Sequence, residues 1–220
     1  MRARGWMDGG RCVAALLAVA VVLPVSSPAW AGTPTDQLKA SVDKVLRILE
    51  DPSAKSPDKT MERRASIRSE VDNIFDFQET AKRALGAHWQ SLGPKEQEEF
   101  VALFADLLER SYLSKIERYS GERITYAGDA VDGDVATVKT RFTTKQGTEF
   151  PIDYRMLRRG DRWLTYDVLI EGVSLVANYR VQFAKIIQAS SYADLVARMR
   201  NGESELNTSG GVKRKDTPRS

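Results

Sequence analysis

The sequence predicts an α+β fold in which helices pack on one face of a four-stranded antiparallel meander sheet. Apolar residues recur at helical spacing between about residues 35 and 120, and then alternate with polar residues from about 124 to 170. Helical spacing returns after Gly172. A run of helices followed by a run of strands is the order typical of an α+β domain.

The first three predicted helices have recognisable signals at their ends. An amphipathic helix over 35–50 is separated by two prolines from a second helix over 60–74. Asp76 is placed to cap a short helix over 77–85, which Gly86 ends. The 60–74 helix has a thin apolar stripe and many Arg and Glu residues, so most of its surface is expected to face solvent.

The longest predicted helix starts at Pro94 and ends at Gly121. Its apolar stripe is broad and rich in aromatic residues: Phe100, Leu103, Phe104, Leu107, Leu108, Tyr112, Ile116 and Tyr119. A face of this width has to be covered by another large element, and the strands that follow are expected to supply this cover.

Four strands are expected to form a meander, because short turns join each strand to the next. The turns are Asp132-Gly133, Gln146-Gly147 and Arg159-Gly160-Asp161. Alternation predicts an apolar inward face made of Ile124, Tyr126, Ala136, Val138, Phe142, Ile152, Tyr154, Met156, Leu164, Tyr166, Val168 and Ile170. The opposite positions predict a polar face toward solvent, with Lys139, Arg141, Asp153, Arg155, Thr165 and Asp167.

Two helices are expected to complete the domain, which we place at residues 32–200. The first follows Gly172 and carries Val173, Val176, Tyr179, Phe183 and Ile187 on one side. The second is short and surrounds Tyr192, Leu195, Val196 and Met199. Residues 201–220 contain few aliphatic side chains, which predicts a disordered C-terminal tail.

The N-terminal segment predicts a cleaved secretory signal over residues 1–31. Three arginines precede an apolar run from Cys12 to Leu23, and the segment ends in Ala29-Trp30-Ala31. A transmembrane anchor is the alternative, but the run is shorter than the roughly 20 residues that a spanning helix needs.

Composition after removal of this signal argues against several classes of function. The chain has 33 Lys and Arg against 30 Asp and Glu, and residues 1–31 hold three of those Arg and one Asp, so the remainder is nearly neutral. A net basic field for nucleic acid is therefore absent. The one cysteine, Cys12, also leaves with the signal, so no disulfide is expected.

Candidate catalytic and metal-binding groups are scarce. His88 is the only histidine, so a zinc site of the usual His and Cys type is not expected, and the nucleophile-elbow and phosphate-loop patterns are absent. Ser174 is interpreted as a helix-start residue. Asp167 and Glu171 leave open an isomerase-like enzyme with a buried carboxylate, although Asp167 falls on the polar face of the predicted sheet.

The apolar faces of the long helix, the sheet and the Gly172 helix all point toward one interior. Such faces usually form an ordinary packed core. They could also line a lipid cavity, because each CH₂ of an acyl chain that is buried there contributes about 0.8 kcal/mol to the free energy of binding. Periodicity alone does not separate these two interpretations.

Four segments, in the same order, resemble the periplasmic phospholipid-binding proteins of the MlaC (toluene-tolerance, Ttg2D-like) family. They are FDFQETAKRALGAHW at 75–89, SLGPKEQEEFVALFADLLERSY at 91–112, DYRMLRRGDRWLTYDV at 153–168 and EGVSLVANYRVQF at 171–183. The resemblance implies that the helices and sheet enclose an apolar cavity for phospholipid tails, with no catalysis and no cofactor other than the lipid cargo.

The resemblance also implies a cellular role and partners. The protein would be a soluble carrier of an ABC-type intermembrane lipid-transport system that maintains outer-membrane lipid asymmetry. Its partners would be an inner-membrane ABC complex and an outer-membrane lipoprotein complex. A hopanoid is the alternative cargo, because a similar subgroup is associated with hopanoid biosynthesis.

Candidate lipid-binding residues lie on a predicted inward face and within a resembling segment. They are Phe104, Leu108, Tyr112, Tyr154, Met156, Tyr166, Val168, Ile170, Val173, Val176 and Tyr179. No catalytic or metal-binding residue is assigned. Besides the carrier and the enzyme, an interaction module with a solid core and an exposed apolar patch remains open.

Overall fold

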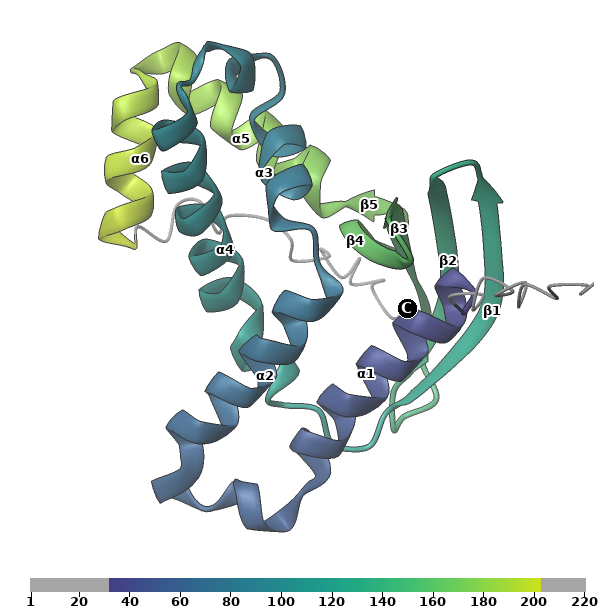
Figure 1. The fold of residues 1–220 in the computed structure, drawn as a ribbon. Coiled ribbons are helices and arrows are strands. Elements are labelled where there is room, and N and C mark those ends of the chain that lie inside the picture. The colour runs from purple at the N-terminus through teal and green to yellow at the C-terminus, as the bar shows by residue number, and fades with distance from the viewer. Residues whose placement is uncertain (1–31, 203–220) are drawn as a thin grey trace, which may run out of the picture. The chain divides into compact units, whose positions relative to one another are not determined.

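A computed structural model describes residues 32–202 of the chain (Figure 1). The helices are α1 (Pro34–Glu50), α2 (Thr60–Ile74), α3 (Phe77–Leu85), α4 (Pro94–Ile116), α5 (Leu175–Ala189) and α6 (Tyr192–Asn201). Short 3₁₀ turns occupy Pro52–Lys55, Pro57–Lys59 and Gly86–Ser91. The strands are β1 (Arg123–Asp132), β2 (Val135–Thr143), β3 (Glu149–Arg159), β4 (Arg162–Ile170) and β5 (Val173–Ser174).

The strands form one antiparallel sheet in the order β1-β2-β3-β4-β5, which confirms the predicted α+β fold and meander. The first and third turns keep to the two residues between strands, where Gly133 and Gly160 adopt positive φ. A fifth strand was not predicted. It is only two residues long and pairs with the end of β4 before the chain enters α5.

Two apolar clusters hold the domain together. The sheet cluster joins α1 and the end of α2 to the inner face of the sheet, through Leu38, Ile74, Ala136, Val138 and Met156. The helical cluster joins α3, α4, α5 and α6 around Phe100, Phe104, Tyr179 and Phe183, with further residues from each helix. The long aromatic face of α4 is therefore covered by other helices, whereas the sequence had suggested the sheet as its cover.

Strand β4 departs from simple alternation. The pairing of β3 with β4 shifts between Arg155 and Met156, so that Arg155 faces Asp167 while Met156 faces Thr165. This bulge inserts Tyr166 as an extra residue and reverses the faces of the first half of β4. Thr165 consequently lies on the inner face opposite Met156, and the predicted inward orientation of Leu164 is wrong.

The predicted polar face is also wrong at Thr165 and Asp167, because both side chains are buried. Helices α3 and α5 pack against β4, and the Asp167 carboxylate is buried against the start of α5. Farther from these helices, Lys139, Arg141 and Arg155 are exposed as expected.

Two predicted helix limits need correction. Helix α4 ends at Ile116 and not at Gly121, and Tyr119 lies beyond it with its hydroxyl donated to the Glu122 carbonyl. Helix α5 starts at Leu175. Ser174 caps this helix, because its hydroxyl accepts a hydrogen bond from the Ala177 amide. Ser174 is thus a helix-start residue, as interpreted from the sequence.

Charged contacts join helix α2 to α4, in addition to its buried residues Ile67 and Ile74. Glu117 at the end of α4 accepts hydrogen bonds from Arg63 and Arg64, at 2.9–3.0 Å. The Arg64 hydrogen bond, together with that of Arg63, holds the pKa of the Glu117 carboxyl below its usual range. Arg68 and Glu109 add a second bridge between the same two helices, at 2.7 Å.

The predicted signal over 1–31 lies outside the described residues, as does most of the predicted tail. The tail was expected to start at residue 201, but Asn201 is still part of α6 and Gly202 caps that helix. Residues 203–220 lie outside the description. No helix formed by residues 32–202 has both the length and the hydropathy needed to cross a membrane.

Candidate functional site

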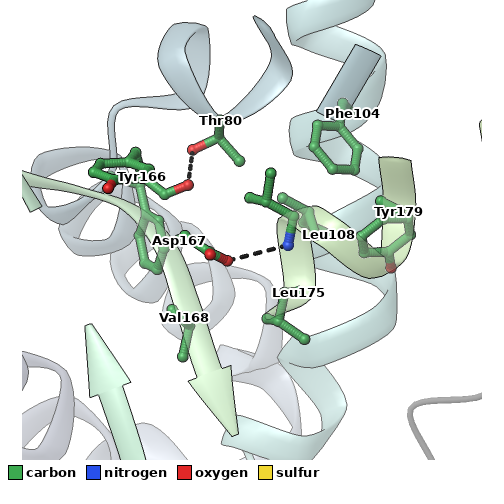
Figure 2. Close-up of a pocket in the computed structure, with 10 residues that line it drawn as sticks. Thr80, Phe104, Leu108, Tyr166, Asp167, Val168, Leu175 and Tyr179 are labelled. Carbon is green, nitrogen blue, oxygen red and sulfur yellow. Dashed lines mark hydrogen bonds between the residues drawn. The ribbon is translucent and has the colours of Figure 1, made fainter. Parts of the chain in front are cut away.

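A small pocket of about 30 Å³, partly open to solvent, lies where the two apolar clusters meet. Figure 2 shows α4 and α5 on one side of it and strand β4 on the other. Its lining is largely apolar and comes from Phe75, Thr80, Phe104, Leu108, Tyr166, Asp167, Val168, Leu175, Val176 and Tyr179.

The helical wall of the pocket is a packed aromatic group. The ring of Phe104 lies 5.1 Å from Tyr179 and 5.2 Å from Phe183, both edge to face. Phe100 also stacks on Phe104, with the ring centroids 5.9 Å apart. These contacts fix Phe104 firmly, since edge-to-face aromatic pairs are favoured beyond the area that they bury.

The wall formed by β4 is tied to α3 by hydrogen bonds. The Asp76 amide donates to the Thr165 carbonyl at 2.8 Å, and the Asp76 carboxylate caps α3 by accepting from Glu79. One turn later the Thr80 hydroxyl reaches the Tyr166 carbonyl at 3.1 Å (Figure 2). The cap predicted at Asp76 therefore also places Thr80 against the bulge of β4.

Asp167 ties the same strand to α5. Its carboxylate accepts from the Val176 amide at 3.1 Å (Figure 2). It also accepts from the Ser174 hydroxyl at 2.7 Å, and Arg155 approaches it at 3.4 Å. An acid near the first turn of a helix satisfies free amide groups and complements the helix dipole. Only 4% of Asp167 is exposed, so this carboxylate is a buried helix anchor with its acceptor sites engaged.

Tyr112 beside the pocket and Tyr154 in the sheet stay protonated well above neutral pH. Burial, together with the Tyr179 hydroxyl to which it is hydrogen-bonded, raises the pKa of Tyr112 to about 12. Burial alone raises the pKa of Tyr154 to about 12. The interior therefore gains no negative charge from these hydroxyls, which suits an apolar ligand.

Six of the eleven candidate residues line the pocket together: Phe104, Leu108, Tyr166, Val168, Val176 and Tyr179. Tyr112 adjoins them through Tyr179. Their convergence comes from three separate elements, α4, β4 and α5.

The other candidates lie elsewhere. Met156 is buried in the sheet cluster, and Tyr154 packs against that cluster while half-buried. Ile170 is half-buried at the end of β4, opposite Ile152. Val173 belongs to β5 and not to a helix, and 62% of it is exposed.

Four lining residues were not among the candidates: Phe75, Thr80, Asp167 and Leu175. Phe75 sits between two helices and forms an isolated bridge to Thr165, which no periodic pattern indicates. Thr80 and Asp167 are polar and were not considered for an apolar interior. Leu175 is the first residue of α5 and is adjacent to the candidate Val176, but the helix was expected to start earlier, at Val173.

No group of three His, Cys, Asp or Glu side chains within residues 32–202 is arranged to hold a metal ion.

A comparison with known protein families shows which family this chain belongs to. The model of the family described as MlaC protein matches residues 39–201. The chain belongs to the MlaC family. The match includes all of the pocket-lining residues and ends at the last residue of α6.

Two curated relatives of this MlaC-family chain are distant in sequence. The intermembrane phospholipid transport system binding protein MlaC of Haemophilus influenzae is 20% identical over 173 residues, which is 76% of this chain and 81% of the relative. The toluene tolerance protein ttg2D of Pseudomonas putida is 27% identical over 96 residues, or 43% of this chain and 45% of the relative.

A solved structure shares the fold. It is a phospholipid-binding protein from Ralstonia solanacearum, determined in complex with a phospholipid. The superposition gives a TM-score of 0.69 at 24% identity and covers 80% of this chain and 99% of the other.

Proposed function

We propose that this MlaC-family chain is a periplasmic carrier that binds phospholipid tails between its two apolar clusters. The observation that carries the proposal is the pocket itself, which lies at the junction of the clusters and is lined mostly by aromatic and aliphatic side chains. Its polar lining groups, Thr80 and Asp167, are already engaged by backbone or side-chain partners. An acyl chain is the ligand chemistry that such a lining favours.

The affinity would come from burial and not from charge. Transfer of each CH₂ from water to an apolar site contributes about 0.8 kcal/mol, so an acyl chain needs no ionic contact to be held tightly. The head group would remain in solvent, where its phosphate keeps its hydration. The relatives named for phospholipid binding or transport agree with this choice of cargo.

Binding would require the pocket to widen. Its volume of about 30 Å³ is far below the roughly 300–1,000 Å³ of typical small-molecule sites, and a phospholipid is a large ligand. Hydrogen bonds fix β4 to α3 and α5, whereas α4 meets the pocket only through Phe104 and Leu108. The aromatic contacts of Phe104 hold its side chain against α5, so Leu108 is the part of the α4 wall that we expect to move when tails enter.

The wider role in this proposal rests on the family and on the N-terminal sequence. Residues 1–31 would act as a signal that delivers the domain to the periplasm. There the carrier would exchange lipid with an inner-membrane ABC complex and an outer-membrane lipoprotein complex. In this scheme the chain carries out no chemistry, because Asp167, its buried carboxylate, serves as a helix anchor.

Replacing Val168 with glutamine tests the pocket directly. Val168 is half-buried in the pocket wall, so an amide at this position would lose hydrogen bonds to water whenever a lipid tail covers it. Such a loss costs about 1–3 kcal/mol, which predicts a phospholipid affinity about five- to one-hundred-fold weaker. The affinity is measured by titrating the delipidated protein with a fluorescent phospholipid.

Val135→Gln is the matched control. Val135 is 41% exposed at the β1–β2 turn and does not line the pocket, so its replacement should leave lipid affinity unchanged. Circular dichroism and urea unfolding show whether each variant is folded. Equal lipid affinity of the folded Val168→Gln variant and wild type would contradict the placement of lipid in this pocket.

A further inference from the structure

The outward face of α5 has an unusual composition for a surface helix. Val176, Tyr179 and Phe183 point into the helical cluster, while Ala177, Val181 and Ala184 form a line on the opposite, exposed side. Val181 is 70% exposed, and Val173 of β5, two residues before the helix starts, is 62% exposed. The helix thus presents aliphatic side chains both to the core and to solvent.

Positive charge borders this outward face on both sides. At 100° per residue, Arg180 falls on one side of the aliphatic line and Lys185 on the other. Leu175–Ala189 contains no Asp or Glu. Neither cation forms an ion pair with any residue between 32 and 202, although Arg180 donates to the Arg83 carbonyl at 2.7 Å.

Neighbouring elements do not supply a competing negative surface along the middle of α5. On α3, which packs beside α5 (Figure 1), Glu79 is already paired with Arg83 and Arg159. Other exposed valines differ in this respect. Val131 and Val135 flank a turn that contains Asp132 and Asp134, so an anionic surface would repel that region.

We propose that this outward face of α5, defined by Ala177, Arg180, Val181, Ala184 and Lys185, docks weakly and reversibly on anionic phospholipid bilayers. Aliphatic side chains flanked by cations are the pattern of helices that lie in the head-group region of a membrane. A protein partner is less favoured by this surface, because the face is only about two turns long and has no aromatic side chain to anchor in a pocket.

This inference rests on the proposed carrier function, and it adds a surface through which the carrier would meet a bilayer. The opposite side of the same helix supplies Leu175, Val176 and Tyr179 to the pocket. A helix with its side chains is about 10–12 Å across, so docking through α5 would bring the pocket within about one helix diameter of the bilayer. A carrier that loads or unloads lipid would benefit from this proximity, and the small apolar area would still allow it to leave.

Vesicle co-sedimentation tests the inference with protein purified from cells that express the full chain. The wild type is expected to sediment with vesicles of phosphatidylcholine mixed with phosphatidylglycerol, to sediment less with phosphatidylcholine alone, and to be released by high salt. The double variant Val181→Asp/Lys185→Glu should bind the anionic vesicles about ten-fold more weakly or worse. The control Val135→Asp/Lys139→Glu makes the same changes on the sheet and should bind as the wild type does.

Several results would overturn the docking surface. They are equal binding of wild type to neutral and anionic vesicles, absence of binding to either, or an equal loss in the control variant. Lipid affinity of the α5 variant is measured in parallel and should be unchanged. If the wild type carries no lipid but still sediments with anionic vesicles, the proposed function fails while the docking surface stands.

Discussion

Replacing Phe104 with alanine is expected to lower the free energy of unfolding by about 3–5 kcal/mol. Phe104 is 1% exposed and contacts the rings of Phe100, Tyr179 and Phe183. Removal of its ring would leave a void next to the pocket and break three aromatic pairs. Urea unfolding of the delipidated protein measures this loss without a contribution from bound ligand.

Phe150→Ala is the control for this substitution. Phe150 is half-buried at the far end of the sheet and pairs with Phe142 at 5.1 Å. We expect its loss to cost about 1 kcal/mol, because little buried volume is vacated. A smaller effect at Phe104 than at Phe150 would mean that the aromatic cluster is not the stable wall of the pocket.

Replacing Asp167 with alanine is expected to cost about 2–4 kcal/mol of stability. The substitution would leave the Val176 amide and the Ser174 hydroxyl without their buried acceptor, and would remove the carboxylate from the first turn of α5. The expected loss exceeds that of an ordinary exposed cap because the group is buried. Thermal or urea unfolding followed by circular dichroism measures it.

Asp153→Ala provides a comparison on the neighbouring strand, where the side chain is half-buried on the polar face. Its replacement should change stability by no more than about 0.5 kcal/mol. A loss at Asp167 no larger than that at Asp153 would contradict the role of Asp167 as the anchor of α5. The isosteric variant Asp167→Asn should still bind lipid, since the carboxylate is not required for apolar burial.

Local signals predicted much of the fold. Asp76 and Ser174 begin helices through hydrogen bonds from their side chains, and such capping residues are visible in sequence. Gly133 and Gly160 adopt the positive φ that tight strand turns require. Helical and strand spacing then identified the α+β class before any contact was known.

Long-range packing explains what the sequence did not predict. The bulge at Tyr166 reverses the faces of β4, and alternation has no signal for an inserted residue. Asp167 reads as a solvent-facing acid along its strand, but α5, which follows it in the chain, folds back and buries it. Leu164 was misplaced for the first reason and Asp167 for the second.

The same distinction applies to the candidate site. Periodicity identified Phe104, Leu108, Val176 and Tyr179 because their helices have one apolar side. It did not identify Phe75, whose position depends on a link between helices and not on a repeating pattern. Val173 was included because the helix was expected to begin two residues early.

The most direct measurement for the carrier account is identification of the lipid that accompanies the purified protein. Full-length chain is expressed in a Gram-negative host and purified, and its organic extract is analysed by mass spectrometry with lipid quantified against protein. The account predicts phospholipid near molar parity, while hopanoid in its place would change the assigned cargo. Protein that contains no lipid and takes up none from vesicles would contradict the carrier function and favour an interaction module with a packed core.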